Sequence, residues 1–348
     1  MIYLLIGLII LILLLLYLLV CLLMVFKMNK EVFLIHGMEP DNPAYIRYED
    51  YPLLKREDYS TFYYDKKING FIYYKEGIKY KGFIILSHGL FGTHIQYLKD
   101  INFLTDRGYK VLAYDQYGCG ISEGKKQEYL AHGIYVCENV INDVIHKNIN
   151  KDLPLILYGH SWGAYSITGA IKNYPQIKKV IARSGPISPR ISGRDLFKVI
   201  NKHLYRFIYI GYNFAYYMIV PFLYRIKATR GPKKNKETQI LFIQSKDDQL
   251  VFFKHSLASY YLKHPQDNCK VELTEKGLHN SFITIDGQNK YKELVSEYSK
   301  LKKENGEKKM KEYMLKLKDR DSLYPVNKEV EKQIIQFLDL ELADTIVK

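Results

Sequence analysis

The residues best suited to chemistry in this chain form the segment Gly159-His160-Ser161-Trp162-Gly163. An apolar, strand-like run at residues 153–158 precedes the segment, and a helix-like run rich in Ala, Ile and Thr follows it. A G-x-S-x-G segment between a strand and a helix is typical of a nucleophile elbow, a strained turn that exposes the serine hydroxyl. The two glycines leave room for the neighbouring strand and helix. Ser161 is therefore the predicted nucleophile, at a helix N-terminus that favours developing negative charge.

The pattern of the remaining chain predicts the elements that position this serine. Strands are expected at residues 61–67, 71–75, 81–87, 109–115, 178–184, 238–245 and 269–274, and helices at residues 96–107 and 127–148. The pair Asn69-Gly70, with Ile68, predicts a hairpin turn between the first two strands. Strands that alternate with helices indicate a mostly parallel sheet covered on both faces. A chain of 348 residues is long enough for the full core of such a domain.

The N-terminal run at residues 2–26 contains no charged residue and consists almost wholly of Leu, Ile, Val and Met. As a helix it would be about 38 Å long, which is enough to cross a bilayer. A signal peptide is the competing interpretation, but the run has no basic segment before it and no small-x-small cleavage site. We therefore predict a single transmembrane anchor at residues 1–27. Lys27 and Lys30 follow the run, and the positive-inside rule then places the main domain in the cytoplasm.

Composition limits the partners and cofactors of the protein. The net charge of +14 suits anionic lipid headgroups, nucleic acid or a solvated basic surface, but no nucleic-acid-binding motif is present. The four cysteines show no metal-ligand spacing and one of them lies in the apolar run, so neither a metal site nor a disulfide framework is expected. We predict no metal, no organic cofactor and no nucleic-acid partner, and the sequence leaves the oligomeric state open.

Four motifs, in this order, resemble those of the α/β-hydrolase superfamily. They are H-G-x-x-G at residues 88–92, D-x-x-G-x-G-x-S at residues 115–122, the G-H-S-W-G segment, and a late acid followed by a late histidine. The resemblance covers residues 62–340 apart from two insertions, and it is greatest to the serine aminopeptidase and monoacylglycerol lipase branch. It implies an α/β-hydrolase fold, with a mostly parallel central sheet, helices on both faces and a helical cap. The apolar N-terminal run adds a transmembrane helix to this fold.

The resemblance also implies a Ser-His-Asp triad. His279, in the loop after the last strand, would take the proton from Ser161, and an aspartate would orient the imidazole. Asp247 and Asp248 both follow the strand at residues 238–245. The family pattern G-x-x-D-x-x-V fits Asp248, with Ser245 in the place of the glycine, so Asp248 is preferred and Asp247 is the alternative.

An oxyanion hole made of two backbone N–H groups is implied in the same way. One N–H is that of Trp162, and the other is that of Leu90, with Phe91 as the alternative. His88 is expected to brace this loop and not to react. Four residues are predicted to shape the site: His88, Gly89, Gly159 and Gly163.

The predicted hydrolase domain, residues 59–348, follows a linker at residues 28–58 and carries two insertions. The first, residues 187–237, is rich in aromatic residues at the cap position of the fold. It is either the inner face of packed helices or a lid that covers an acyl group or rests on the bilayer, and we favour the lid. The second, residues 288–322, is lysine-rich and expected to be helical with a break at Asn305-Gly306. It is a solvated surface insertion or a basic patch that faces anionic lipid.

The sequence thus predicts a membrane-anchored serine hydrolase that cleaves carboxylic esters through an acyl-enzyme, in the manner of a lipase, esterase or lysophospholipase. Its expected partners are an apolar acyl ester and the lipid bilayer. A serine peptidase of the aminopeptidase type and a thioesterase are alternative enzymes. A binding or scaffold protein without turnover is the alternative of another class. The presence of all three triad positions and both oxyanion loops disfavours the scaffold, while the fold alone does not determine the substrate.

Overall fold

The computed structural model describes residues 1–31, 44–124, 130–200, 203, 205–219, 225–317 and 319–340. Several predicted features lie partly outside these residues. They are the linker at 32–43, the start of the helix at 127–129, the cap at 201–202, 204 and 220–224, and the C-terminal segment 341–348.

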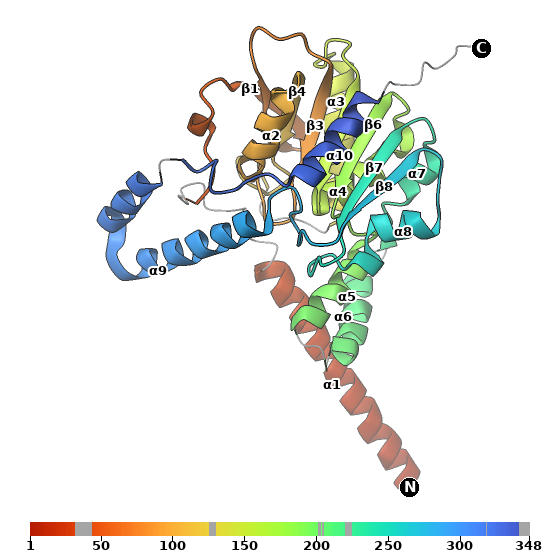
Figure 1. The fold of residues 1–348 in the computed structure, drawn as a ribbon. Coiled ribbons are helices and arrows are strands. Elements are labelled where there is room, and N and C mark those ends of the chain that lie inside the picture. The colour runs from red at the N-terminus through yellow and green to blue at the C-terminus, as the bar shows by residue number, and fades with distance from the viewer. Residues whose placement is uncertain are drawn as a thin grey trace, which may run out of the picture.

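Within the described residues, eight strands form one sheet in the order β1-β2-β4-β3-β5-β6-β7-β8 (Figure 1). The strands are β1 (Lys55–Tyr63), β2 (Lys66–Tyr74), β3 (Gly82–Ser87), β4 (Tyr109–Tyr114), β5 (Leu155–His160), β6 (Ile177–Arg183), β7 (Gln239–Ser245) and β8 (Cys269–Thr274). β2 pairs antiparallel with β1 and β4, and all other neighbours pair in parallel. The predicted mostly parallel sheet is confirmed.

Helices cover both faces of this sheet, as predicted. They are α1 (Ile2–Glu31), α2 (Leu98–Thr105), α3 (His132–His146), α4 (Trp162–Ala170), α5 (Pro189–Ile200), α6 (Tyr205–Ile219), α7 (Arg230–Lys234), α8 (Leu257–Lys263), α9 (Ile285–Lys316) and α10 (Lys328–Asp339). One core cluster joins the sheet to α3, α4 and α8, and a second joins it to α2 and α10. Every residue of β3 and β5 is buried, which explains why these strands are continuous apolar runs in the sequence.

The predicted hairpin turn at Asn69-Gly70 is wrong. Both residues lie inside β2, and the turn is formed by Tyr64, which has φ of 52°, and Asp65. Gly70 pairs with Tyr114 of β4, and a Cβ at Gly70 would lie 2.6 Å from the Tyr114 Cα. The glycine is therefore needed where two strands approach closely, a tertiary reason that imitates the local signal for a turn.

The second half of the predicted linker, residues 44–58, is not a linker but belongs to the body of the domain. β1 begins at Lys55, inside the range that was assigned to the linker. Ala44, Tyr51 and Leu54 are buried in the same core cluster as α2 and α10. The Tyr324 hydroxyl donates to the Ala44 carbonyl oxygen, which ties this segment to the chain that precedes α10.

Most of the second insertion lies in α9. At the predicted break, Asn305-Gly306, the helix bends but does not end. The Tyr313 hydroxyl donates to Glu297 Oε2 at 2.8 Å, across 16 residues of the chain. In a straight helix these residues would lie about 24 Å apart. The helix therefore reverses between Glu297 and Tyr313, the interval that contains the Asn-Gly pair (Figure 1).

The N-terminal helix α1 projects from the domain, and the cap helix α6, which packs on α5, lies beside its C-terminal half (Figure 1). Its segment Ile2–Met24 is long and apolar enough to cross a membrane. Cys21 is buried against Tyr212, Ala215 and Tyr216 of α6. The cap thus contacts the predicted anchor as well as the hydrolase domain.

Candidate active site

Ser161 occupies the sharp turn between β5 and α4, with φ of 57° and ψ of −119°. This conformation is strained for any residue other than glycine. A Cβ at Gly159 would lie 2.6 Å from the Gly163 carbonyl carbon, and a Cβ at Gly163 would overlap the carbonyl oxygen of Ser87. The two glycines therefore let strand, turn and helix approach closely enough to hold Ser161 in this geometry.

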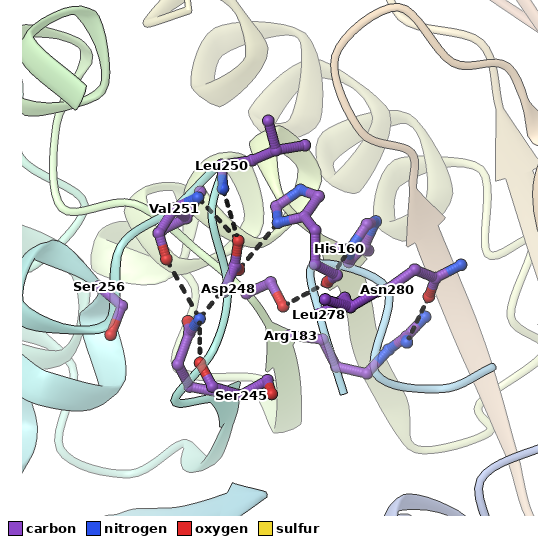
Figure 2. A network of polar contacts seen from close by, with 12 residues as sticks. His160, Arg183, Ser245, Asp248, Leu250, Val251, Ser256, Leu278 and Asn280 are labelled. Atoms are coloured by element: carbon purple, nitrogen blue, oxygen red, sulfur yellow. Dashed lines mark hydrogen bonds and ion pairs between the residues drawn. The ribbon is translucent and has the colours of Figure 1, made fainter. Parts of the chain in front are cut away.

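Asp248 and His279 come together from two different loops, after β7 and after β8. His279 Nδ1 lies 2.8 Å from Asp248 Oδ2, and the carboxylate is fully buried. The amides of Leu250 and Val251 each donate to Asp248 Oδ1 at 2.9 Å (Figure 2). The Gln244 side chain donates to Oδ2 at 3.0 Å. With its Nδ1 held by this fixed carboxylate, His279 can take up a proton at Nε2.

Asp247, the alternative acid, has a different partner. Its Oδ1 accepts hydrogen bonds from the amides of Gly277 at 3.0 Å and Leu278 at 2.8 Å. Burial raises the pKa of Asp247, but hydrogen bonds from Ser245 and from these amides outweigh it, so the pKa lies below its ordinary value. Asp247 therefore holds the turn that precedes His279, and Asp248 is the aspartate that contacts the imidazole.

His88 braces the loop that follows β3. Its Nδ1 donates to the Gly89 carbonyl oxygen at 2.8 Å, and its Nε2 accepts from the Gln116 amide at 2.8 Å. Burial lowers the pKa of His88, which keeps the ring neutral and makes both roles possible at once. Its two bonds link the β3 loop to the loop after β4, so His88 is placed to support the site and not to react in it.

The residues of the predicted oxyanion donors line the same cavity as Ser161. In the described part of the chain, the amides of Trp162, Leu90 and Phe91 have no hydrogen-bond partner, so each of them can receive an anion. The Gly89 amide already donates to the Tyr97 hydroxyl at 2.9 Å. The Trp162 indole N–H donates to the carbonyl oxygen of Leu130, just before α3, at 2.7 Å.

Tyr97 is a residue of the site that sequence reasoning missed. Its hydroxyl accepts from Gly89 and lies 2.8 Å from His160 Nδ1, while His160 Nε2 lies 3.0 Å from the His279 carbonyl oxygen. Burial, together with His279 and Arg183, lowers the pKa of His160 well below its ordinary value, so this ring is neutral. Nothing local in the sequence identifies Tyr97. Gln244 was also missed, although a polar residue at the end of the apolar run of β7 was a usable signal.

Ser161, His279, Leu90 and Trp162 line one cavity of about 500 Å³. Tyr212 and Tyr216 of α6, and further apolar and aromatic side chains, form much of its wall. Such a cavity suits a largely apolar small molecule. No group of three His, Cys, Asp or Glu residues among those described could hold a metal ion.

Asp100 is the one carboxylate among the described lining residues of this cavity. It pairs with the buried Arg183 and accepts a hydrogen bond from the Tyr158 hydroxyl at 2.7 Å. Arg183 therefore compensates the negative charge of Asp100.

Comparison with known proteins is consistent with this geometry. A family model described as serine aminopeptidase, S33, matches residues 78–215. A proline iminopeptidase of Thermoplasma volcanium is 31% identical over 142 residues, which cover 39% of this chain and 46% of that protein. The matched stretch thus spans less than half the length of this relative.

Solved structures extend the similarity beyond that stretch. An esterase of Pyrococcus furiosus has a TM-score of 0.54 at 20% identity, over 77% of this chain and 95% of that chain. An acylaminoacyl peptidase of Pyrococcus horikoshii has a TM-score of 0.51 at 16% identity, over 76% of this chain and 44% of that chain. At these identities the similarity concerns the fold. Together with the sheet order and the nucleophile elbow, it shows that the chain has the α/β-hydrolase fold, and residues 78–215 match the serine aminopeptidase family model.

Proposed function

We propose that the protein is a membrane-anchored serine hydrolase that cleaves carboxylic esters with an apolar acyl group. The observation that carries this proposal is the joint presence of Ser161, His279 and an apolar wall in one cavity of about 500 Å³. The apolar helix α1 would hold the enzyme at the bilayer, where such esters are concentrated.

In this mechanism the Ser161 hydroxyl oxygen attacks the carbonyl carbon of the ester, and its proton passes to His279 Nε2. Asp248 stabilises the imidazolium that forms. The negative charge on the former carbonyl oxygen is received by the amides of Trp162 and Leu90. His279 then returns the proton to the leaving alcohol, which yields an acyl-enzyme. Water, deprotonated by His279, attacks that acyl-enzyme and releases the carboxylic acid together with the free serine.

An aminopeptidase that acts on small peptides is the second candidate, and the similarity to serine aminopeptidases and to a proline iminopeptidase favours it. A peptide substrate of this kind carries a free ammonium group, which needs an uncompensated carboxylate or a comparable acceptor. Among the described lining residues, the one carboxylate is Asp100, and Arg183 neutralises it. This charge balance favours an uncharged acyl group over an aminoacyl group.

The test uses the full chain solubilised in detergent and labelled with a fluorophosphonate probe. We expect labelling of the wild type and none of Ser161→Ala. Labelling that persists in Ser161→Ala would contradict the assignment of the nucleophile. Absence of labelling in a folded wild type would favour the scaffold alternative.

Substrate class is tested next, with p-nitrophenyl esters of increasing acyl length, a matched thioester and a prolyl p-nitroanilide. We expect kcat/KM to be highest for the longer acyl esters. A preference for the prolyl anilide would replace the esterase by the peptidase, and a preference for the thioester would replace it by the thioesterase.

A further inference from the structure

The cap helix α6 and the N-terminal helix α1 form a close joint at Gly211. A Cβ at Gly211 would overlap the Cys21 sulfur and would lie 2.6 Å from the Tyr17 hydroxyl oxygen. A larger residue at this position would have to displace both side chains, and with them the contacts that hold the two helices together. Small residues at such crossings are typical of helix pairs in membranes, because they let the backbones approach.

A polar contact between the two helices adds specificity to this joint. The Tyr17 hydroxyl donates to the Phe207 carbonyl oxygen and accepts from the Gly211 amide at 2.8 Å. These two backbone groups, four residues apart, would normally bond to each other within α6. The Tyr17 hydroxyl of the anchor thus bonds to both members of one backbone pair of the cap helix, which sets the register of α1 against α6.

The outer face of α6 is apolar and exposed. Phe207, Ile210, Phe214 and Met218 are 48–65% exposed and follow one stripe of the helix, at spacings of three and four residues. The opposite face is also apolar, with Tyr212 and Tyr216 packed on the anchor. A helix that is apolar on both faces is typical of an element surrounded by protein or by lipid.

The residues next to this stripe indicate that lipid, and not protein, covers the exposed face of α6. Leu19, Val20 and Leu23 of α1, on the segment that contacts α6, are at least half exposed and apolar as well. Arg190 and Arg225 lie beside the stripe, where they line a groove together with Phe214. Apolar side chains next to arginines are typical of helices that lie in the interface of an anionic bilayer.

We propose that α1 and α6 form one membrane-docked unit, in which the Gly211 joint holds the outer face of the cap helix in the lipid interface. Tyr212 and Tyr216 belong to the same helix and line the cavity that contains Ser161. The wall of the cavity is then a helix that touches the bilayer. The proposal depends on the anchor part of the proposed function and is independent of hydrolysis.

The test measures fluorescence quenching by brominated phosphatidylcholine, in vesicles that also contain phosphatidylglycerol and the full chain. Ile210→Trp places a probe on the outer face of α6, Leu13→Trp on the anchor and Phe62→Trp on β1, where Phe62 is 64% exposed. The buried Trp162 of the parent chain supplies the background, which is subtracted. We expect quenching of the probes at positions 210 and 13 and none at position 62. Quenching at position 13 alone, at none of the positions, or equally at all three would overturn the proposal.

A second pair of variants tests the joint itself. Gly211→Leu should abolish the quenching of the probe at position 210 while the probe at position 13 remains quenched. Gly7→Leu is the matched control, because a Cβ at Gly7 meets no atom within 4 Å. If Gly211→Leu leaves the quenching at position 210 unchanged, the joint does not hold the cap in the lipid. Because both readouts are optical, they remain informative if the chain proves to have no esterase activity.

Discussion

His160 Nε2 lies 3.0 Å from the carbonyl oxygen of His279, so the residue before the proposed nucleophile holds the backbone of the proposed general base. The other ring nitrogen of His160 lies 2.8 Å from the Tyr97 hydroxyl, which in turn accepts from the Gly89 amide. The loop after β3, the elbow and the loop after β8 are therefore linked by one chain of hydrogen bonds. These hydrogen bonds fix the position of the loop with the proposed oxyanion donors relative to the imidazole of His279.

Tyr97→Phe should disturb that chain without removing a reacting group. It leaves the buried Gly89 amide without an acceptor and His160 Nδ1 without a donor, at a cost of about 1–3 kcal/mol in the free energy of unfolding. We expect kcat to fall about 10- to 100-fold, because small displacements at a reacting centre have such effects, while KM for a short ester changes little. Denaturant unfolding and steady-state kinetics check both expectations.

Tyr80→Phe is the matched control for this prediction, since its hydroxyl donates to a nearby carbonyl away from the cavity. It should leave kcat unchanged. An equal loss of kcat in both variants would contradict the role of Tyr97.

Substitution of the two neighbouring aspartates should have very different effects on kcat. Asp248→Asn should lower kcat by about 10⁴-fold, because the amide favours the wrong imidazole tautomer. Asp247→Asn should lower it far less, since Asp247 contacts the turn before His279 and not the ring. Hydrolysis of a short p-nitrophenyl ester by the two variants measures the difference. The opposite order would assign the acid to Asp247.

Much of this architecture is predictable because its signals are local. β3 and β5 are continuous apolar runs, β8 alternates apolar and polar residues, and the elbow shows its serine between two glycines. Asp248 and His279 follow their strands directly, which is where parallel strands bring loops together. Local periodicity and short motifs therefore suffice for these parts.

The features that were missed depend on contacts between distant residues. A glycine is required at position 70 because β4, which comes later in the chain, approaches closely there. The Asn69-Gly70 pair only resembles the local signal for a turn. Tyr97 and His160 meet across 63 residues, and Tyr17 and Gly211 across 194 residues. No periodic pattern in the sequence reports such pairs, because the packing of whole elements creates them.

Buried neutral histidines should make the fold sensitive to mild acid. The pKa values of His88 and His160 are lowered by burial below the ordinary value of 6.5. Between those lowered values and 6.5, the unfolded chain binds more protons than the folded chain, so stability falls as the pH falls below 6.5. Each histidine contributes a loss of up to about 1.4 kcal/mol per pH unit in that window.

Thermal unfolding between pH 7.5 and 5 measures this dependence. The slope of Tm against pH should become smaller in His160→Gln, which retains a polar side chain but cannot take up a proton in the unfolded state. A slope that is the same in wild type and His160→Gln would contradict the assignment of a lowered pKa to His160.

Disruption of the joint between α1 and α6 should slow the hydrolysis of esters dissolved in the membrane more than the hydrolysis of esters dissolved in water. Tyr212 and Tyr216 line the cavity and pack on the anchor, so separation of the two helices displaces one wall of the cavity from the lipid. We expect Gly211→Leu to reduce kcat/KM for a long-chain ester dispersed in vesicles about 10-fold or more, which corresponds to about 1.4 kcal/mol in the free energy of the transition state. A short, water-soluble ester should be hydrolysed at nearly the wild-type rate, because the contact between His279 and Asp248 is made by other elements. Gly7→Leu should behave like the wild type with both esters. An equal loss with both esters would mean that the joint supports the fold of the site and does not supply it with substrate from the membrane.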